Sequence, residues 1–194
     1  DLLSLPWVEN HYALIVWKLA CMGRSFPDTL GGLYMNKLRV LKQLQSRYAT
    51  EIASGVRPIF RKVAEKDDEA TRYMVVVVTR VIDLGEDFVP PPPAAAGGDA
   101  EEMDEKIANM IVASFATIEV TDGWYVFRAK LDAKLTEHLA MGRIFPGLKL
   151  KICGARLQGV TEACPPLELP ESAFLALSVN GRRRAKWNAR LGLR

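Results

Sequence analysis

The sequence predicts an α+β protein in which a small α-helical domain packs on a five-stranded β-barrel. Apolar residues recur at helical spacing as far as about Ala70, and runs rich in valine and isoleucine follow. The chain has 194 residues, of which 49% are hydrophobic, and this suits one large domain or two small ones. We therefore expect a helical domain over residues 1–70 and a barrel domain over residues 71–194.

The helical part begins with a cap signal. Ser4 stands two positions before Pro6, which is typical of an N-cap followed by the first helical turn. Apolar residues then recur every three or four positions until Gly23, where we expect the helix to stop. A second amphipathic run spans residues 38–55, and a short third helix opens at Pro58. Such helices cannot hide their apolar faces alone, so they must pack on something else.

The barrel part carries five runs of strand character, at residues 73–84, 116–121, 124–131, 149–157 and 173–179. Asp122 and Gly123 between the second and third runs are a strong hairpin signal. A helix from Ala133 to about Met141 follows the third strand. The order of three strands, a helix and two strands is that of the OB fold, a five-stranded barrel.

Residues 85–113 form an insertion of different composition. Residues 85–106 hold seven acids and one base, and residues 90–93 are all proline. Few apolar groups are present to offset the free-energy cost of ordering such a segment. We expect a disordered acidic and proline-rich insertion, which limited proteolysis should cut first between Glu86 and Glu105.

The sequence holds no recognisable catalytic or metal-binding motif. His11 shares a helix face with Ile15, which favours a core or interface histidine over a catalytic one. The chain has three cysteines without a paired spacing, which predicts no disulfide framework and a reducing compartment. No apolar run approaches the roughly 20 residues that cross a bilayer. We therefore expect that the chain has no enzymatic activity, binds no cofactor or metal, and has no membrane partner. The chain begins without methionine, which suggests a piece of a longer chain.

Several strings are more specific than these patterns. They are residues 7–12 with 17–20, residues 39–44 with 47–48 and 50–52, residues 121–125, residues 154–155 with Leu157 and Gly159, and residues 163–168 with 170–172. Together they resemble the DNA-binding region of the breast cancer type 2 susceptibility protein family. The resemblance covers the end of that family's helical domain and its first OB fold.

The resemblance implies a nuclear, tumour-suppressor-type mediator of homologous recombination in DNA double-strand break repair. Such a mediator loads a RecA-like recombinase onto single-stranded DNA, and the recombinase-binding repeats lie outside these residues. The resemblance also implies a small, very acidic partner, known from the split-hand/split-foot locus and the proteasome lid. The family's strongest single-strand contacts belong to later OB folds. We therefore expect only weak single-stranded DNA binding here.

Two candidate DNA-binding sets follow from the residues. Trp124, Arg128 and Lys130 share one strand face, where a ring stacks a base and cations follow the phosphates. The alternative for Trp124 is packing against the helical half. The second set lies near the C-terminus and consists of Arg182, Arg183, Arg184 and Lys186. Its alternative is a solvated linker.

The helical half supplies a candidate surface for the acidic partner. Aromatic and basic side chains alternate there at spacings too wide for all the rings to enter a small core. The candidates are Trp7, Tyr12, Trp17, Lys18, Arg39, Lys42, Arg47 and Tyr48. The alternatives are that the rings are all core and the bases merely solvated, or that the chain is a structural or oligomerising scaffold with little DNA affinity.

Overall fold

The computed structural model describes residues 4–30, 34–84 and 116–193, and the predicted insertion with its cleavage sites lies outside them. The helical part contains α1 (Leu5–Ser25), α2 (Pro27–Leu30), α3 (Lys37–Tyr48) and a π-helical turn, η1 (Ala49–Ala53). The Ser4 side chain accepts a hydrogen bond from the backbone N–H of Trp7, as the predicted cap requires. The predicted stop at Gly23 is wrong, because α1 continues to Ser25.

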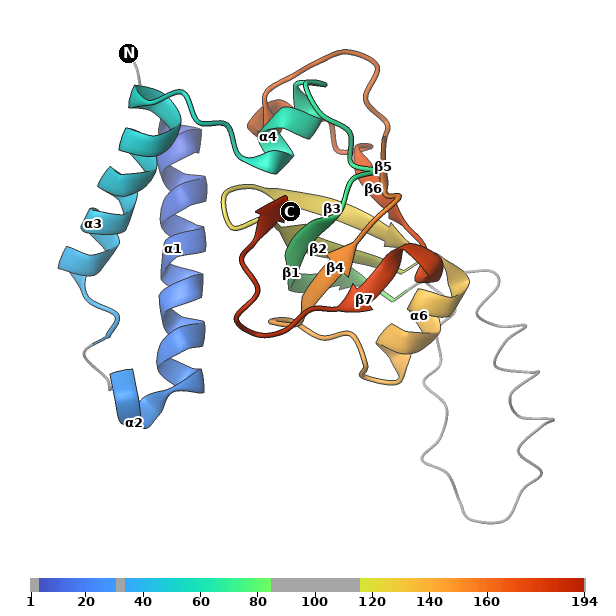
Figure 1. Cartoon of the computed structure of the whole chain (residues 1–194), viewed down its shortest axis with the longest axis horizontal. Coiled ribbons are helices and arrows are strands. Elements are labelled where there is room, and N and C mark those ends of the chain that lie inside the picture. The colour runs from blue at the N-terminus through green and yellow to red at the C-terminus, as the bar shows by residue number, and fades with distance from the viewer. Residues whose placement is uncertain (1–3, 31–33, 85–115, 194) are drawn as a thin grey trace.

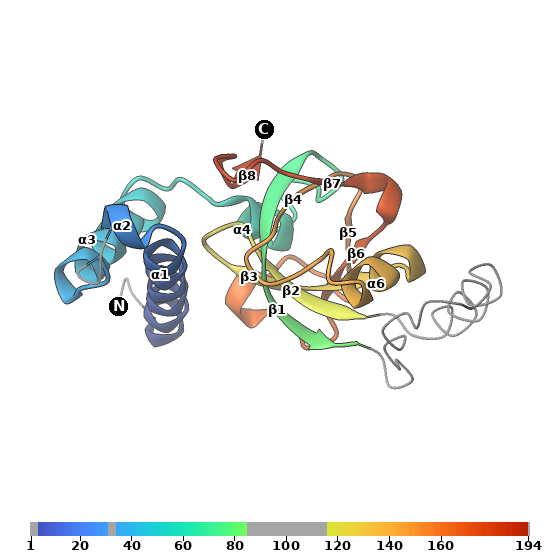
Figure 2. The ribbon, with the colours of Figure 1, turned by 90° about the horizontal axis from the view of Figure 1, so that it is seen from below.

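Helices α1 and α3 lie side by side (Figures 1 and 2). Buried positions on α1 fall on one stripe, which begins at Trp7 and His11 and continues through Ile15 to Leu19. The later part of this stripe meets Val40 of α3 in a small apolar core. The first part, Trp7 and His11, faces the sheet domain instead. One face of α1 therefore contacts both α3 and the sheet domain.

The sheet domain begins with the short helix α4 (Ile59–Ala64), and its described residues contain eight strands. They are β1 (Met74–Asp83), β2 (Thr117–Thr121), β3 (Val126–Leu131), β4 (Lys149–Ile152), β5 (Arg156–Gln158), β6 (Phe174–Leu177), β7 (Arg182–Arg184) and β8 (Gly192–Leu193). Helix α6 (Ala133–Ala140) stands between β3 and β4, as predicted, and two 3-10 turns, η2 (Pro166–Glu168) and η3 (Val179–Gly181), flank β6. The hydrogen-bonded order is β5-β6-β3-β2-β1-β4-β7, with β8 paired to β1.

The closed five-stranded barrel is not what the hydrogen bonding shows. The predicted strand over residues 149–157 is divided into β4, which pairs with β1 and β7, and β5, which pairs with β6. Gly154 lies between the two at a φ of +72°, a left-handed conformation that breaks the ladder. The sheet is therefore open along its hydrogen-bonded path, and β3 and β6 form its parallel pair.

Helix α4 belongs to the core of the sheet domain. Phe60 is fully buried and stacks on Phe127 of β3, with ring centroids 4.2 Å apart. Ile59 and Val63 join the same apolar cluster as the inward residues of the sheet. The structural division of the chain thus precedes α4, whereas the sequence placed it near Ala70.

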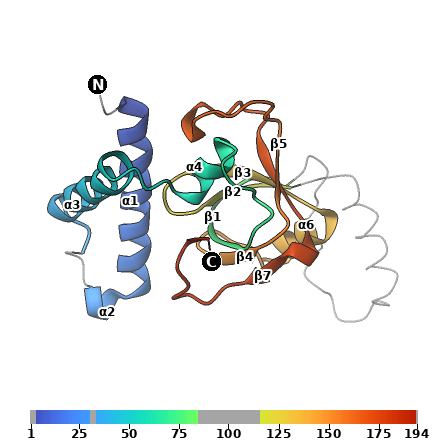
Figure 3. The same cartoon turned by 45° about the horizontal axis from the view of Figure 1, so that its top comes forward.

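The β2–β3 connection reaches toward α1 (Figure 3). The pairing of Thr121 with Val126 leaves four residues in this loop, so Trp124 lies in the turn and not in the strand. The buried carboxylate of Asp122 accepts hydrogen bonds from the backbone N–H groups of Phe60, Trp124 and Tyr125. One side chain therefore fixes both the hairpin and the start of α4.

Candidate nucleic-acid and partner interfaces

The helical domain is joined to the sheet domain through Glu51 of η1, whose side chain is fully buried. Its carboxylate accepts hydrogen bonds from Trp7 Nε1 at 2.9 Å and from the Tyr125 hydroxyl at 2.5 Å. Arg61 of α4 donates to it at 2.9 Å, and His11 Nε2 lies 3.4 Å from the same group. Four elements of the chain thus converge on one carboxylate.

The electrostatics of this cluster favour an ionised Glu51. Burial alone raises the pKa of a carboxyl group, but hydrogen bonds from His11, Tyr125, Trp7 and Arg61 outweigh that effect and lower the pKa of Glu51 to about 2. Burial and the neighbouring Glu51 both raise the pKa of the Tyr125 phenol, so it stays a donor. Sequence reasoning missed Glu51, because nothing in its local pattern marks it as buried.

His11 is a buried interface residue, as the sequence favoured. Its ring is fully buried, stacks on Trp7 at a centroid distance of 4.0 Å, and meets the edge of Tyr125. Nδ1 of His11 lies 2.9 Å from the carbonyl oxygen of Trp7 and 3.1 Å from Nδ2 of Asn10. Trp7 is buried as well, which corrects its prediction as an exposed partner-binding ring.

Trp124 packs against the helical half, which was the alternative to a DNA-stacking role. The Arg47 guanidinium lies 5.1 Å from the centroid of its ring, and His11 meets that ring edge-on. Asn10 also donates to the Trp124 carbonyl at 2.8 Å. Burial lowers the pKa of Arg47 to about 10, although Asp122 and Glu51 oppose this shift. Trp124 and Arg47 therefore both pack at the interface between the two domains.

Arg128 and Lys130 stay exposed on the outer face of β3. Lys130 Nζ lies 4.3 Å from the centroid of the Phe174 ring, which comes from the parallel neighbour β6 and is partly buried. Sequence reasoning missed Phe174, because only the β3–β6 pairing brings it beside Lys130. A cation over an aromatic ring is the combination that stacks bases and follows phosphates. We call Arg128, Lys130 and Phe174 the β3–β6 face.

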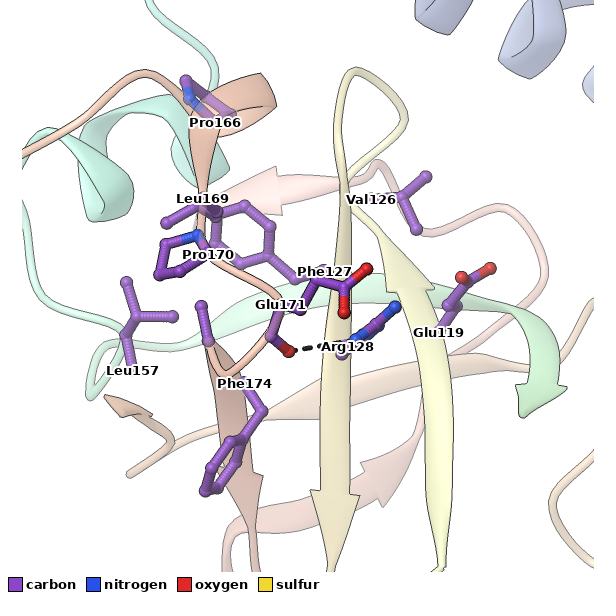
Figure 4. Close-up of a pocket in the computed structure, with 11 residues that line it drawn as sticks. Glu119, Val126, Phe127, Arg128, Leu157, Pro166, Leu169, Pro170, Glu171 and Phe174 are labelled. Carbon is purple, nitrogen blue, oxygen red and sulfur yellow. Dashed lines mark hydrogen bonds between the residues drawn. The ribbon is translucent and has the colours of Figure 1, made fainter. Parts of the chain in front are cut away.

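A pocket of about 240 Å³ borders this face. Figure 4 shows Arg128 pointing to the Glu171 carbonyl, to which it donates at 2.9 Å, with Glu119 beside it. Glu119 is also the direct cross-strand partner of Arg128 and forms an ion pair with Arg80. Pro166, Pro170 and other residues of the β5–β6 connection complete the lining. Arg128 is therefore held in place by the Glu171 carbonyl, with the carboxylate of Glu119 on the facing strand.

The C-terminal basic set is folded, so it is not a solvated linker. Arg182, Arg183 and Arg184 form β7 and pair with β4, and only Arg183 and Arg184 are exposed. Lys186 follows at the surface. Burial lowers the pKa of Arg182, and its Nε has no hydrogen-bond partner among the described residues. The set does not join the β3–β6 face, because β2 and β1 lie between β3 and β4.

The remaining partner candidates are scattered over the helical domain. Tyr12 is 54% exposed, Trp17 and Tyr48 are half-buried, and Lys42 is exposed. Arg39 lies over the ring of Tyr34, 4.3 Å from its centroid. Lys18 is exposed as a residue, donates to Gln43, and has a pKa lowered by burial and by nearby Arg47. These side chains do not form one continuous patch around a pocket.

The larger apolar groove lies elsewhere, between the end of α1 and the segment after β7. It measures about 780 Å³, and its walls include Met22, Phe26, Phe145 and Trp187. Trp187 is 75% exposed, and its ring centroid lies 5.9 Å from the ring centroid of Phe26. Arg184, Lys149 and Lys186 also line this groove, which combines apolar rings with bases. We call it the α1–β7 groove.

Comparison with known proteins agrees with this architecture. A family model described as BRCA2, helical, matches residues 1–55, and one described as BRCA2, oligonucleotide/oligosaccharide-binding, domain 1, matches residues 58–194. This chain belongs to the BRCA2 family. Two relatives from Arabidopsis thaliana are Protein BREAST CANCER SUSCEPTIBILITY 2 homolog A, 33% identical over 191 residues, and homolog B, 34% identical over 191 residues. The matches cover 97% of this chain and 15% of each relative.

The two BRCA2 matches meet just before α4, where the structure also divides. The BRCA2 OB domain thus includes α4 and the whole eight-stranded sheet. No group of three His, Cys, Asp or Glu side chains within residues 4–30, 34–84 and 116–193 is placed to hold a metal ion. All three cysteines are free thiols. Within the same residues, no helix combines the length and apolar character that a membrane span needs.

Proposed function

We propose that this chain is a non-catalytic binding module of a homologous-recombination mediator, acting in the nucleus during DNA double-strand break repair. Membership of the BRCA2 family supports this proposal, together with an OB fold, whose strands and loops commonly bind oligonucleotides. The whole protein would load a RecA-like recombinase onto single-stranded DNA, using segments beyond this chain. This module would contribute a DNA contact and a docking site.

The DNA contact rests on one observation, the β3–β6 face. Lys130 is exposed on β3, one of the strands whose face OB folds commonly use for ligands, and it lies over the partly buried ring of Phe174 on β6. Arg128 adds charge there, but Glu119 opposite it and its bond to the Glu171 carbonyl reduce its availability. Binding through this face alone should therefore be weak and should favour single strands, whose bases are free to stack.

The docking site is the α1–β7 groove, together with the exposed rings and bases of the helical domain. A small, very acidic chain would bury apolar side chains against Phe26 and Trp187, while its carboxylates meet Arg184 and Lys186. A partner that orders on binding needs an extended interface to offset its entropy loss. The groove and the exposed Tyr12 and Lys42 offer separate points along such a path.

A titration of fluorescent oligo-dT at several salt concentrations tests the DNA contact. The double variant Arg128→Gln/Lys130→Gln should bind more weakly, and its plot of log K against log salt should be shallower by about 1.4, because each phosphate contact on a single strand contributes about 0.7. Arg24→Gln/Lys37→Gln removes the same charge from exposed positions in the helical domain, outside this face, and is the matched control. An unchanged slope in the first variant would remove the β3–β6 face from the proposal.

A second candidate function is a structural scaffold with little DNA affinity. The observation that favours it is that Trp124 and Arg47 pack at the domain interface. An aromatic ring and a cation are therefore unavailable to any DNA surface. Absence of measurable oligo-dT binding by the wild-type chain at low salt, with the protein folded, would select this function.

A further inference from the structure

A second exposed cation–aromatic cluster lies on the outer side of β1, β4 and β7. Tyr73, immediately before β1, is 55% exposed, and Lys151 Nζ of β4 lies 4.5 Å from the centroid of its ring. Arg183 of β7 is exposed and is the direct cross-strand partner of Lys151. We call these three residues the Tyr73 cluster.

The pairing of Lys151 with Arg183 is electrostatically unfavourable on its own. Directly opposed residues on antiparallel strands place their side chains on the same face, and like charges there destabilise the pair. Within the described residues, no carboxylate forms an ion pair with either cation. The β3–β6 face differs, because Arg128 is opposed there by Glu119. A bound anion would relieve the repulsion that the chain itself leaves uncompensated.

A pocket of about 170 Å³ opens at the same place. Its lining includes Tyr73, Lys151, Asn180, Arg182 and Arg183 and contains no carboxylate. Lys151 is half-buried and Arg183 is exposed, and their direct pairing puts both cations on the same face as this pocket. A pocket this small, rich in donors and edged by an aromatic ring, suits a phosphate group with a nucleobase next to it.

We propose that the Tyr73 cluster is a second contact site for single-stranded DNA. A backbone phosphate would lie between Lys151 and Arg183, and the adjoining base would stack on the free face of Tyr73. The site rests on the proposed function but is separate from the β3–β6 face, because β2 and β1 stand between β3 and β4 in the sheet. With two separate contact sites, a single DNA strand could pass around the sheet domain.

The test compares oligo-dT binding by three variants of the chain. Lys151→Gln/Arg183→Gln should lower affinity and make the log K against log salt plot shallower by about 1.4, since two phosphate contacts are lost. Tyr73→Ala should lower affinity at least about fivefold without changing the slope, because stacking on one ring is lost. Tyr73→Phe keeps the ring and should bind as the wild type does.

Arg24→Gln/Lys37→Gln again supplies the charge-matched control, and circular dichroism checks that each variant is folded. Photocrosslinking with 5-iododeoxyuridine should attach the oligonucleotide to the peptide that contains Tyr73, and Tyr73→Ala should abolish that product. Equal losses in the control and the Lys151/Arg183 variant, or no loss in the latter, would overturn the proposal. So would binding of a polyglutamate peptide that depends on Lys151 and Arg183 while oligo-dT binding does not, because the site would then take an acidic protein.

The outcomes separate this site from the proposed function. If Arg128→Gln/Lys130→Gln weakens binding while Lys151→Gln/Arg183→Gln does not, the DNA-binding function stands and the Tyr73 cluster is excluded. If the wild type binds no oligo-dT, the proposed DNA contact and this second site both fail.

Discussion

The hydroxyl of Tyr125 lies 2.5 Å from Glu51 Oε1, across the boundary between the helical and sheet domains. The two residues are 74 positions apart in the chain. Their bond joins the π-helical turn after α3 to the β2–β3 hairpin, and Trp7 and Arg61 bind the same carboxylate. This cluster holds the two domains in a fixed relation, so the α1–β7 groove, which both domains line, depends on it.

Replacement of Glu51 should therefore destabilise the whole chain. Glu51→Gln removes the charge that Trp7, Tyr125 and Arg61 share, but Arg61 is partly exposed and keeps its pair with Glu65, so we expect the lower end, about 3 kcal/mol, of the cost of breaking a buried pair. We expect the thermal midpoint, followed by circular dichroism and tryptophan fluorescence, to fall by roughly 10 °C. Glu137→Gln, which loses only a surface pair with Lys134, should change stability by less than about 1 kcal/mol. Equal effects of the two variants would show that the Glu51 cluster is not a major source of stability.

The same carboxylate should make stability depend on acid pH. The pKa of Glu51 is about 2 in the folded chain and about 4.5 without the fold, so the unfolded state binds a proton more readily. The contribution of Glu51 is then fully present above about pH 4.5 and is lost as the pH falls toward 2. Urea unfolding at pH values from 6 to about 3 should show this decline. In Glu51→Gln the decline over that interval should be smaller, and parallel curves for the two proteins would contradict the assignment.

Trp124 should contribute to stability and not to DNA binding. Trp124→Ala removes a ring that contacts Arg47 and His11, and we expect a loss of about 2–3 kcal/mol in the free energy of unfolding. The affinity of the folded variant for oligo-dT should stay within about twofold of the wild type. Trp187→Ala, at a highly exposed ring, should change stability by less than about 0.5 kcal/mol. A strong loss of DNA affinity in a stable Trp124→Ala protein would restore the stacking role.

Two glycines should respond oppositely to replacement by alanine. Gly123 has a φ of +94°, and a Cβ there would lie 3.1 Å from Leu191 Cδ1, so Gly123→Ala should destabilise by about 1–2 kcal/mol. Gly23 lies in α1 with nothing within 4 Å of its added Cβ. Gly23→Ala should therefore stabilise by about 0.5–1 kcal/mol. Chemical denaturation of both variants measures the two signs, and a stabilised Gly123→Ala would refute the hairpin geometry.

The α1–β7 groove should decide whether an acidic partner docks. Coexpression with the small acidic protein should give a complex that elutes together in gel filtration at micromolar concentration. Trp187→Ala should weaken the complex by about 30-fold or more if this ring is a hot spot. Leu167→Ala, an exposed apolar residue of η2 outside the groove, is the matched control. Separate elution of two intact proteins would exclude docking to this chain.

Local pattern was enough for the helices and for strands β1, β2 and β3, because the spacing of apolar residues along the chain indicates which face each element buries. The cap at Ser4, the amphipathic stripe of α1 and the helix after β3 all follow from spacing. The same reasoning favoured an interface role for His11 and offered packing as one choice for Trp124. Exposed or buried alternation also placed Arg128 and Lys130 correctly on the outer face of β3.

Other features depend on residues far apart in sequence and were decided only by the tertiary structure. From its local pattern, Glu51 is indistinguishable from an ordinary surface acid. Only the fold brings Trp7, Arg61 and Tyr125 around it, and a buried charge is tolerated only where such partners reach it. The division of β4 from β5, the strand formed by the C-terminal arginines and the opposition of Lys151 to Arg183 arise in the same way. Sequence determines which side chains face outward along one strand, but only strand pairing determines which charges face each other.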